Sequence, residues 1–273
     1  MVEALEFTER VRLLWCEFTV RTNSEMVWNL LRAITPHAKQ NMPVTLRFDL
    51  SVTWSKDEFR ILGEGIDDFE FSPVMTAQAV YQAMQDLTLA AVPDHIPMAA
   101  ALGIDREKCF LLVGRGKTTL SVRLMLANMD IAGDALALLC NGYATAFPRK
   151  FLLRPDSLAL LPEVGTINSL AEVPPENQLM LFDPRDFGRP WRIAPTLVST
   201  IVYIEPNYGG HSRLLRCGKL EMTRRVTPYC AMPRSGRRDW IGDLSDTVDR
   251  AENFIIELGD LDTAAAVLGD ALS

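Results

Sequence analysis

The sequence is poor in the residues that build metal centres and disulfide frameworks. Its 273 residues include three histidines, far apart, and five cysteines, an odd number with no Cys-x-x-Cys spacing. Cys109 and Cys140 lie in apolar runs, where a free thiol behaves as a small core residue. These shortages argue against a disulfide scaffold and against a metalloenzyme built on cysteine or histidine.

Long apolar runs and an excess of basic residues are also absent. No run approaches the about 18 apolar residues of a membrane span, and the N-terminus carries acid where a signal peptide needs a basic segment. The 28 basic and 35 acidic residues give a formal net charge of −7. A protein with this charge is poorly suited to bind a polyanion such as nucleic acid. We therefore expect a globular, cytoplasmic protein with no membrane or nucleic-acid partner.

The pattern along residues 1–92 predicts an α/β lobe rich in strands. Residues 27–34 carry apolar side chains on one helical face, and Ser24 is placed to cap that helix. Residues 44–54 alternate between apolar and polar, which is typical of a half-buried strand, and residues 59–62 are expected to pair with it. Thr76 is expected to cap a second helix.

Residues 93–273 predict a second, α/β core. Residues 109–113 form a short continuous apolar run, as expected of a strand buried on both faces, and a helix is expected over 120–128. Asn141-Gly142 is the strongest two-residue hairpin signal. Further strands are expected over residues 131–140, 143–147, 197–204 and 254–258, with a closing helix over 261–272.

One motif between a predicted strand and a predicted helix points to phosphate binding. It reads Gly114-Arg115-Gly116-Lys117-Thr118-Thr119. Glycines let backbone N–H groups turn toward phosphate oxygens, the helix N-terminus adds partial positive charge, and the lysine neutralises the β- and γ-phosphates. The Thr118 hydroxyl is the expected Mg²⁺ ligand.

The motif is shorter than a full phosphate-binding loop. A GxxxxGK[ST] loop has a glycine five residues before Gly116, where this chain has Leu111, and a start at Gly114 leaves the loop three residues short. A shorter loop offers fewer N–H donors. The alternative interpretation is a tight strand-to-helix turn with a solvated Lys117.

Asp134 is the carboxylate singled out by its apolar surroundings. It lies near the start of the run 131–140, and a carboxylate there is costly unless it binds metal, pairs or faces a cleft. In that role it would hold Mg²⁺ or accept a proton from a substrate hydroxyl. The alternative is a turn residue that follows Gly133.

A basic stretch later in the chain has two interpretations. It is either a solvated face with acidic partners nearby or a docking surface for an acidic peptide or phosphate. Its members are Arg213, Arg216, Lys219, Arg224, Arg225, Arg234, Arg237 and Arg238.

Three segments together resemble the HPr serine kinase-like family, which includes bacterial HPr kinase/phosphorylase. They are the motif at 114–120, the stretch Ala132-Gly133-Asp134-Ala135-Leu136-Ala137-Leu138, and Phe147-Pro148-Arg149-Lys150-Phe151. The resemblance extends from about residue 95 to the end and more faintly through the N-terminal strands. Two departures are that Asp134 is followed by Ala135 rather than a second acid, and that no histidine directly precedes the phosphate-loop strand.

This resemblance implies a P-loop core shared by HPr kinase and phosphoenolpyruvate carboxykinase, in an α/β (α+β) fold. It implies ATP and Mg²⁺, and a serine hydroxyl on a peptide or protein as acceptor, not necessarily HPr. Lys117 and Thr118 would lie on the nucleotide phosphates and metal, Asp134 would be the acid/base, and Arg149 would lie near the phosphates or the acceptor. Relatives also suggest assembly into a homo-oligomer. The departures support the alternative of a catalytically inactive binding or assembly protein on the kinase fold.

Overall fold

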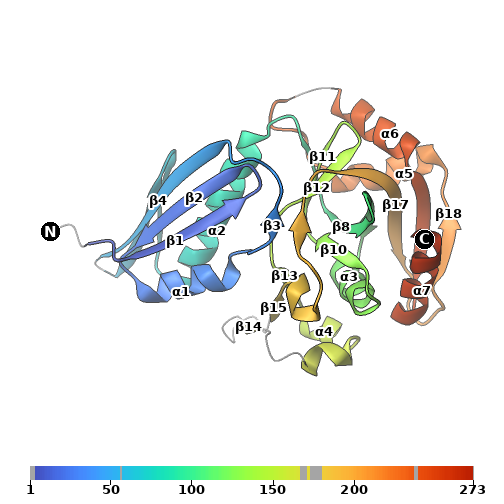
Figure 1. Cartoon of the computed structure of the whole chain (residues 1–273), viewed down its shortest axis with the longest axis horizontal. Coiled ribbons are helices and arrows are strands. Elements are labelled where there is room, and N and C mark those ends of the chain that lie inside the picture. Colours follow the sequence, from blue (N-terminus) through green and yellow to red (C-terminus); the bar gives the residue numbers. More distant parts are fainter. Residues whose placement is uncertain (1–3, 56, 167–170, 173–179, 237–238, 273) are drawn as a thin grey trace. The chain divides into compact units, whose positions relative to one another are not determined.

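The computed structural model describes residues 4–55, 57–166, 171–172, 180–236 and 239–272 (Figure 1). The chain divides into two compact units, Met1–Pro93 and Asp94–Ser273. The fold class is mixed α/β, with seven α-helices in the described residues. None of these helices is both long and apolar enough to span a membrane.

The first unit is one five-stranded sheet with two helices. The strand order is β1-β2-β4-β5-β6, and all neighbours are antiparallel except the parallel pair β2 and β4. Helices α1 and α2 pack on each other and on the sheet. The elements are β1 (Phe7–Leu13), β2 (Cys16–Thr22), α1 (Glu25–Ile34), β3 (Lys39–Gln40), β4 (Leu46–Ser55), β5 (Glu58–Gly63), β6 (Ile66–Glu70) and α2 (Pro73–Ala91).

Most sequence expectations for this unit are confirmed. Ser24 caps α1, its hydroxyl accepting the N–H of Val27 at 3.4 Å, and β4 pairs with β5 as a hairpin. The expected cap at Thr76 is wrong. The helix starts earlier because Pro73 occupies its first turn, so Ser72 is the N-cap and the Thr76 hydroxyl donates to the Ser72 carbonyl at 2.7 Å.

The second unit is built on a nine-stranded sheet. Its path is β10-β8-β9-β17-β12-β11-β7, and β19 pairs with both β17 and β18. Strands β9, β17 and β19 are parallel to one another. The sheet strands are β7 (Ile96–Met98), β8 (Ala100–Asp105), β9 (Lys108–Gly114), β10 (Asp130–Gly133), β11 (Ala137–Cys140), β12 (Tyr143–Ala146), β17 (Thr196–Pro206), β18 (Arg213–Arg216) and β19 (Glu252–Leu258).

Helices cover both faces of this sheet. Side chains of α3 and α7 share one core with Phe110 and Leu112 of β9. Side chains of α5 and α6 share the other core with Leu111 and Val113. This explains why β9 is a continuous apolar run, as expected. The remaining elements are α3 (Lys117–Leu126), β13 (Phe151–Leu153), α4 (Pro155–Leu158), β14 (Ala171–Glu172), β15 (Met180–Phe182), β16 (Arg192–Ile193), α5 (Lys219–Val226), α6 (Trp240–Arg250) and α7 (Leu261–Leu272).

The expected single strand over residues 131–140 is two strands. β10 ends at Gly133 and β11 begins at Ala137, and Asp134 lies in the bend between them. The chain must leave β8, which β10 pairs with, before it can pair with β7 and β12 through β11. The Asn141-Gly142 hairpin between β11 and β12 is confirmed, and both residues have the positive φ that this turn requires.

A substitution at Gly103, which lies close to Phe110 in the neighbouring strand, tests the packing of β8 on β9. A Cβ atom at Gly103 would lie 2.0 Å from the ring of the buried Phe110, so Gly103→Ala must displace a core side chain. We expect a loss of about 1–3 kcal/mol in the free energy of unfolding, measured by urea titration. In the control Gly242→Ala the new methyl meets no atom within 4 Å in a helix, so stability should stay equal or rise. Equal stability of both variants would contradict this packing.

Candidate functional site

The glycine motif forms a tight turn at the carboxyl end of β9. Gly114 and Gly116 have φ values of 118° and 91°, which favour glycine. Strand β9 runs through Gly114, where a Cβ would lie 2.5 Å from the carbonyl oxygen of Ile204 in the neighbouring strand. Helix α3 begins directly after the turn, at Lys117. Leu111, the position where a full loop has its first glycine, is buried inside β9, so the loop is short for a structural reason.

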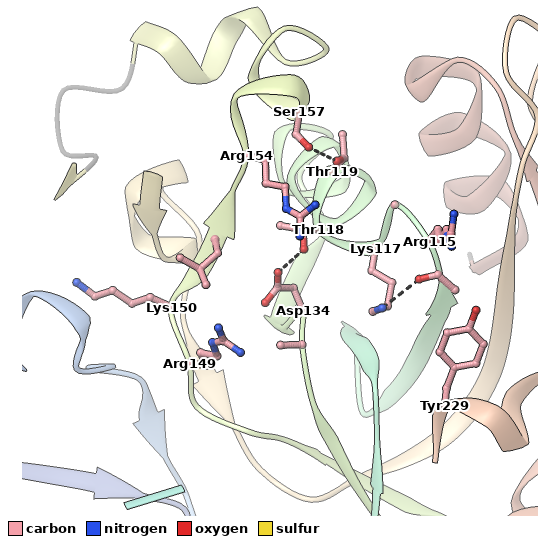
Figure 2. Close-up of a pocket in the computed structure, with 14 residues that line it drawn as sticks. Arg115, Lys117, Thr118, Thr119, Asp134, Arg149, Lys150, Arg154, Ser157 and Tyr229 are labelled. Carbon is pink, nitrogen blue, oxygen red and sulfur yellow. Dashed lines mark hydrogen bonds between the residues drawn. The ribbon is translucent and has the colours of Figure 1, made fainter. Parts of the chain in front are cut away.

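This turn opens onto a cavity of about 810 Å³ in the second unit (Figure 2). The cavity brings together the residues that the sequence assigned to phosphate, metal and acceptor: the six motif residues 114–119, Asp134 and Arg149. The carboxyl ends of β9, β17 and β19 lie at the same edge because the three strands are parallel. Ligands of open α/β sheets bind at this edge.

Asp134 and Thr118 are the central pair of the cavity. The Thr118 hydroxyl donates to Asp134 Oδ2 at 2.6 Å. Asp134 is 5% exposed. Its burial raises the pKa of the carboxyl to about 6, against the Thr118 hydrogen bond and the charges of Arg149 and Lys117. Although Asp134 lies in a bend, as the alternative interpretation held, its side chain faces the cavity.

Lys117 bends back over its own loop. Its ammonium donates to the carbonyl oxygen of Gly114 at 3.0 Å. Burial lowers the pKa of Lys117, and the nearby charge of Asp134 opposes this shift. The ammonium is thus held at the mouth of the turn by one carbonyl group.

Sequence reasoning missed several residues that line the cavity. Lys150 and Arg154 add positive charge, and Ser157 Oγ accepts a hydrogen bond from the Thr119 hydroxyl at 3.0 Å. Tyr229, which lies much later in the sequence than the other lining residues, also lines the cavity. Only Lys150 had a local signal, since it adjoins Arg149, whereas the others approach through the tertiary fold.

The basic stretch is mostly a paired surface. The interpretation as a solvated face with acidic partners is favoured by ion pairs of Arg213 with Glu257 and of Arg225 with Glu221 and Glu205. Arg216 and Lys219 also lie within 4 Å of carboxylates. Arg237 and Arg238 lie outside the described residues.

No protein-family model matches this chain, and no curated protein matches it significantly. In the described part of the chain, no group of three or more His, Cys, Asp or Glu residues could hold a metal ion. The chemistry of the cavity is therefore what indicates a function.

The buried carboxylate makes stability depend on pH. Folding raises the pKa of Asp134 from 3.8 to about 6, so the native state binds this proton more tightly than the unfolded state does. Protonation of Asp134 therefore stabilises the native state. That advantage is complete below about pH 3.8 and is lost as the pH rises through about 6. Asp134→Asn retains an acceptor for Thr118 and removes the buried charge. We expect it to stabilise the metal-free protein by on the order of 1–3 kcal/mol at pH 8 and by much less at pH 4.

Thermal or urea unfolding of both proteins at the two pH values measures this difference. Asp246→Asn, which changes an exposed aspartate in α6, is the matched control and should show no such pH dependence. A loss of stability in Asp134→Asn at pH 8 would contradict the buried-charge account.

Proposed function

We propose that this protein is a cytoplasmic, ATP-dependent kinase with a P-loop core of the HPr serine kinase-like type. It would transfer the γ-phosphoryl group of ATP to a serine hydroxyl on a peptide or protein. The observation that carries this proposal is the meeting of a glycine turn, Lys117 and the hydrogen-bonded pair Thr118–Asp134 in one cavity at the carboxyl end of strand β9.

The first turn of α3 and Lys117 would hold the nucleotide phosphates. The leading N–H groups of a helix have no carbonyl partner within the helix, and the helix dipole favours an anion there. Among the described residues, the Gly114 carbonyl is the one hydrogen-bond partner of the Lys117 ammonium, and a phosphate oxygen can replace it. Partial burial strengthens its attraction to an anion.

The residues present also fit Mg²⁺. Magnesium prefers oxygen ligands and takes few from the protein, with substrate phosphates and water completing its shell. The Thr118 hydroxyl and the Asp134 carboxylate supply two such oxygens 2.6 Å apart. When bound, Mg²⁺ would neutralise charge on the β- and γ-phosphates.

Asp134 and Arg149 would act on the transferred group. The acceptor oxygen forms a bond to the γ-phosphorus, the bond from that phosphorus to the β–γ bridging oxygen breaks, and ADP leaves. The proton of the acceptor hydroxyl goes to the Asp134 carboxylate. Arg149 lies near enough to Asp134 to influence its ionisation, so its positive charge can stabilise the equatorial phosphoryl oxygens.

A second hollow of about 580 Å³ offers room for the nucleoside. It shares Arg115, Gly116 and Thr119 with the first cavity, so it begins where the phosphates would end. Leu160 and Tyr208 line it and are 63% and 90% exposed. Exposed apolar and aromatic side chains beside an anion site suit a planar base.

A catalytically inactive binding or assembly protein on the same fold is the second candidate. The short loop favours it, because strand β9 continues through Gly114 and leaves few N–H groups to turn inward. The hydrogen bond of Lys117 to its own loop also favours it, since that bond satisfies the lysine without any ligand.

Nucleotide binding separates the two candidates. We expect wild type to bind Mg-ATP saturably in calorimetry, and Lys117→Ala to bind at least about 10-fold more weakly because a charged contact to phosphate is lost. Lys108→Ala is the matched control, since Lys108 is an exposed lysine at the opposite end of β9. It should bind like wild type. Failure of well-folded wild type to bind would rule out the kinase in favour of the second candidate.

The nucleoside hollow has its own test. The double variant Leu160→Ala, Tyr208→Ala should weaken Mg-ATP binding by about 10-fold because stacking and apolar contact are lost. It should leave the binding of magnesium tripolyphosphate unchanged, because that ligand has no base. The control Leu220→Ala removes a leucine that is 85% exposed outside both cavities. Equal effects on both ligands would contradict this assignment.

A further inference from the structure

The hollow beside the main cavity has two walls that lie far apart in the chain. The first wall is residues 160–163, which follow α4, and the second wall is residues 258–262, where β19 ends and α7 begins. Helix α3 contributes Thr119 and Arg123 to the same hollow. Since the two walls are not neighbours in the sequence, tertiary contacts must set the distance between them.

The guanidinium group of Arg123 contacts both walls. Its Nη1 donates to Glu163 Oε1 in the first wall at 2.9 Å, and its Nη2 forms an ion pair with Asp262 in the second wall. The Arg123 side chain is 24% exposed. A guanidinium is planar and its N–H groups have fixed directions, so one arginine can fix the positions of two carboxylates relative to each other.

The apolar core holds only the buried part of each wall. Leu161 is buried in the core that α3 shares with α7, and Leu258 and Leu261 pack against that core. The side chains that face a ligand, by contrast, lie outside it, and Leu160 is 63% exposed. The contacts of Arg123 therefore act on the part of the hollow that the core does not fix.

The two walls differ in how much they depend on Arg123. The second wall has its own fixed point, because the Asp260 carboxylate accepts the N–H of Thr263 at 2.7 Å at the start of α7. The first wall is held to α3 through Arg123 and, one helical turn earlier, through the Thr119 hydroxyl, which donates to Ser157 (Figure 2). Loss of Arg123 should therefore loosen mainly the first wall, which carries Leu160.

We propose that Arg123 is a positioning residue for the nucleoside, and that its contacts with Glu163 and Asp262 hold the two walls at the separation in which the base binds. This inference rests on the proposed function, which places the nucleoside in this hollow. A wall that is already ordered loses less conformational entropy when the ligand binds, so the arginine would increase affinity without touching the phosphates.

Calorimetry with two ligands tests this role. Mg-ATP has a base, and magnesium tripolyphosphate does not. In Arg123→Met, which keeps an apolar stem, we expect Mg-ATP to bind about 5- to 10-fold more weakly and tripolyphosphate to stay within about 2-fold of wild type. Arg123→Lys keeps the charge but lacks the fork that reaches both carboxylates, so its affinity for Mg-ATP should fall between the two.

Amide hydrogen exchange of the ligand-free protein tests the contact itself. The N–H groups of Leu160, Leu161 and Val164 donate to carbonyls of the same segment, so their exchange reports local opening. Arg123→Met and Glu163→Ala should each speed this exchange by at least about 3-fold. Asp262→Asn leaves the contact with Glu163 in place and should not.

Arg225→Met is the matched control. Arg225 lies in α5, its side chain is 26% exposed, and it pairs with the two carboxylates of Glu205 and Glu221 outside both cavities. The substitution removes the same kind of contact elsewhere in the unit. It should change neither the ratio of the two affinities nor exchange in the first wall.

The outcomes separate this inference from the proposed function. If Arg123→Met speeds exchange but the ratio of the two affinities is unchanged, the ion pairs are only structural and the inference is overturned. Equal weakening of both ligands would also overturn it and assign Arg123 to the phosphates. If wild type binds no Mg-ATP, the proposed function fails and the nucleoside role fails with it, while the exchange data still show whether Arg123 holds the first wall.

Discussion

The parallel pairing of β9 with β17 is the constraint on which the candidate site depends. The pairing continues to Gly114 opposite Ile204, where the backbones approach too closely for a side chain. The chain must therefore turn at a glycine, and the turn leads directly into α3. Strand β19 pairs with the other edge of β17 in the same direction, so its following loop reaches the same end of the sheet. The register of these three strands thus brings the N-terminus of α3 together with the loops that follow β17 and β19.

The electrostatics of the cavity oppose stability. Asp134 is buried, so its ionised form gains from the Thr118 hydroxyl and two cations but loses hydration. Lys117 loses hydration as well and has a backbone carbonyl as its hydrogen-bond partner. A core selected for stability alone would replace such groups with apolar side chains. Their retention in one cavity, beside the positive charge of Arg149, is typical of a site whose charges are completed by ligands.

Much of the fold could be predicted from the sequence, because local patterns report local structure. The alternation in residues 44–54 and the apolar run 109–113 correspond to β4 and β9, and Asn141-Gly142 forms the hairpin turn. The wrong predictions arose where a nearby residue or a change of strand partner overrode the local pattern. Pro73 moved the start of α2 away from Thr76, and the change of strand partners divided residues 131–140 around Asp134.

The sequence by itself determined the glycine turn, its lysine and the candidate carboxylate, because glycine φ preferences and an acid within an apolar run are properties of short segments. Only the tertiary structure decided that Asp134 accepts from Thr118 and that Arg154 and Tyr229 line the same cavity. These residues lie far apart in the chain and carry no shared motif. Their meeting depends on sheet order and on the segment around β13, and both are set by the packing of the whole unit rather than by any local pattern.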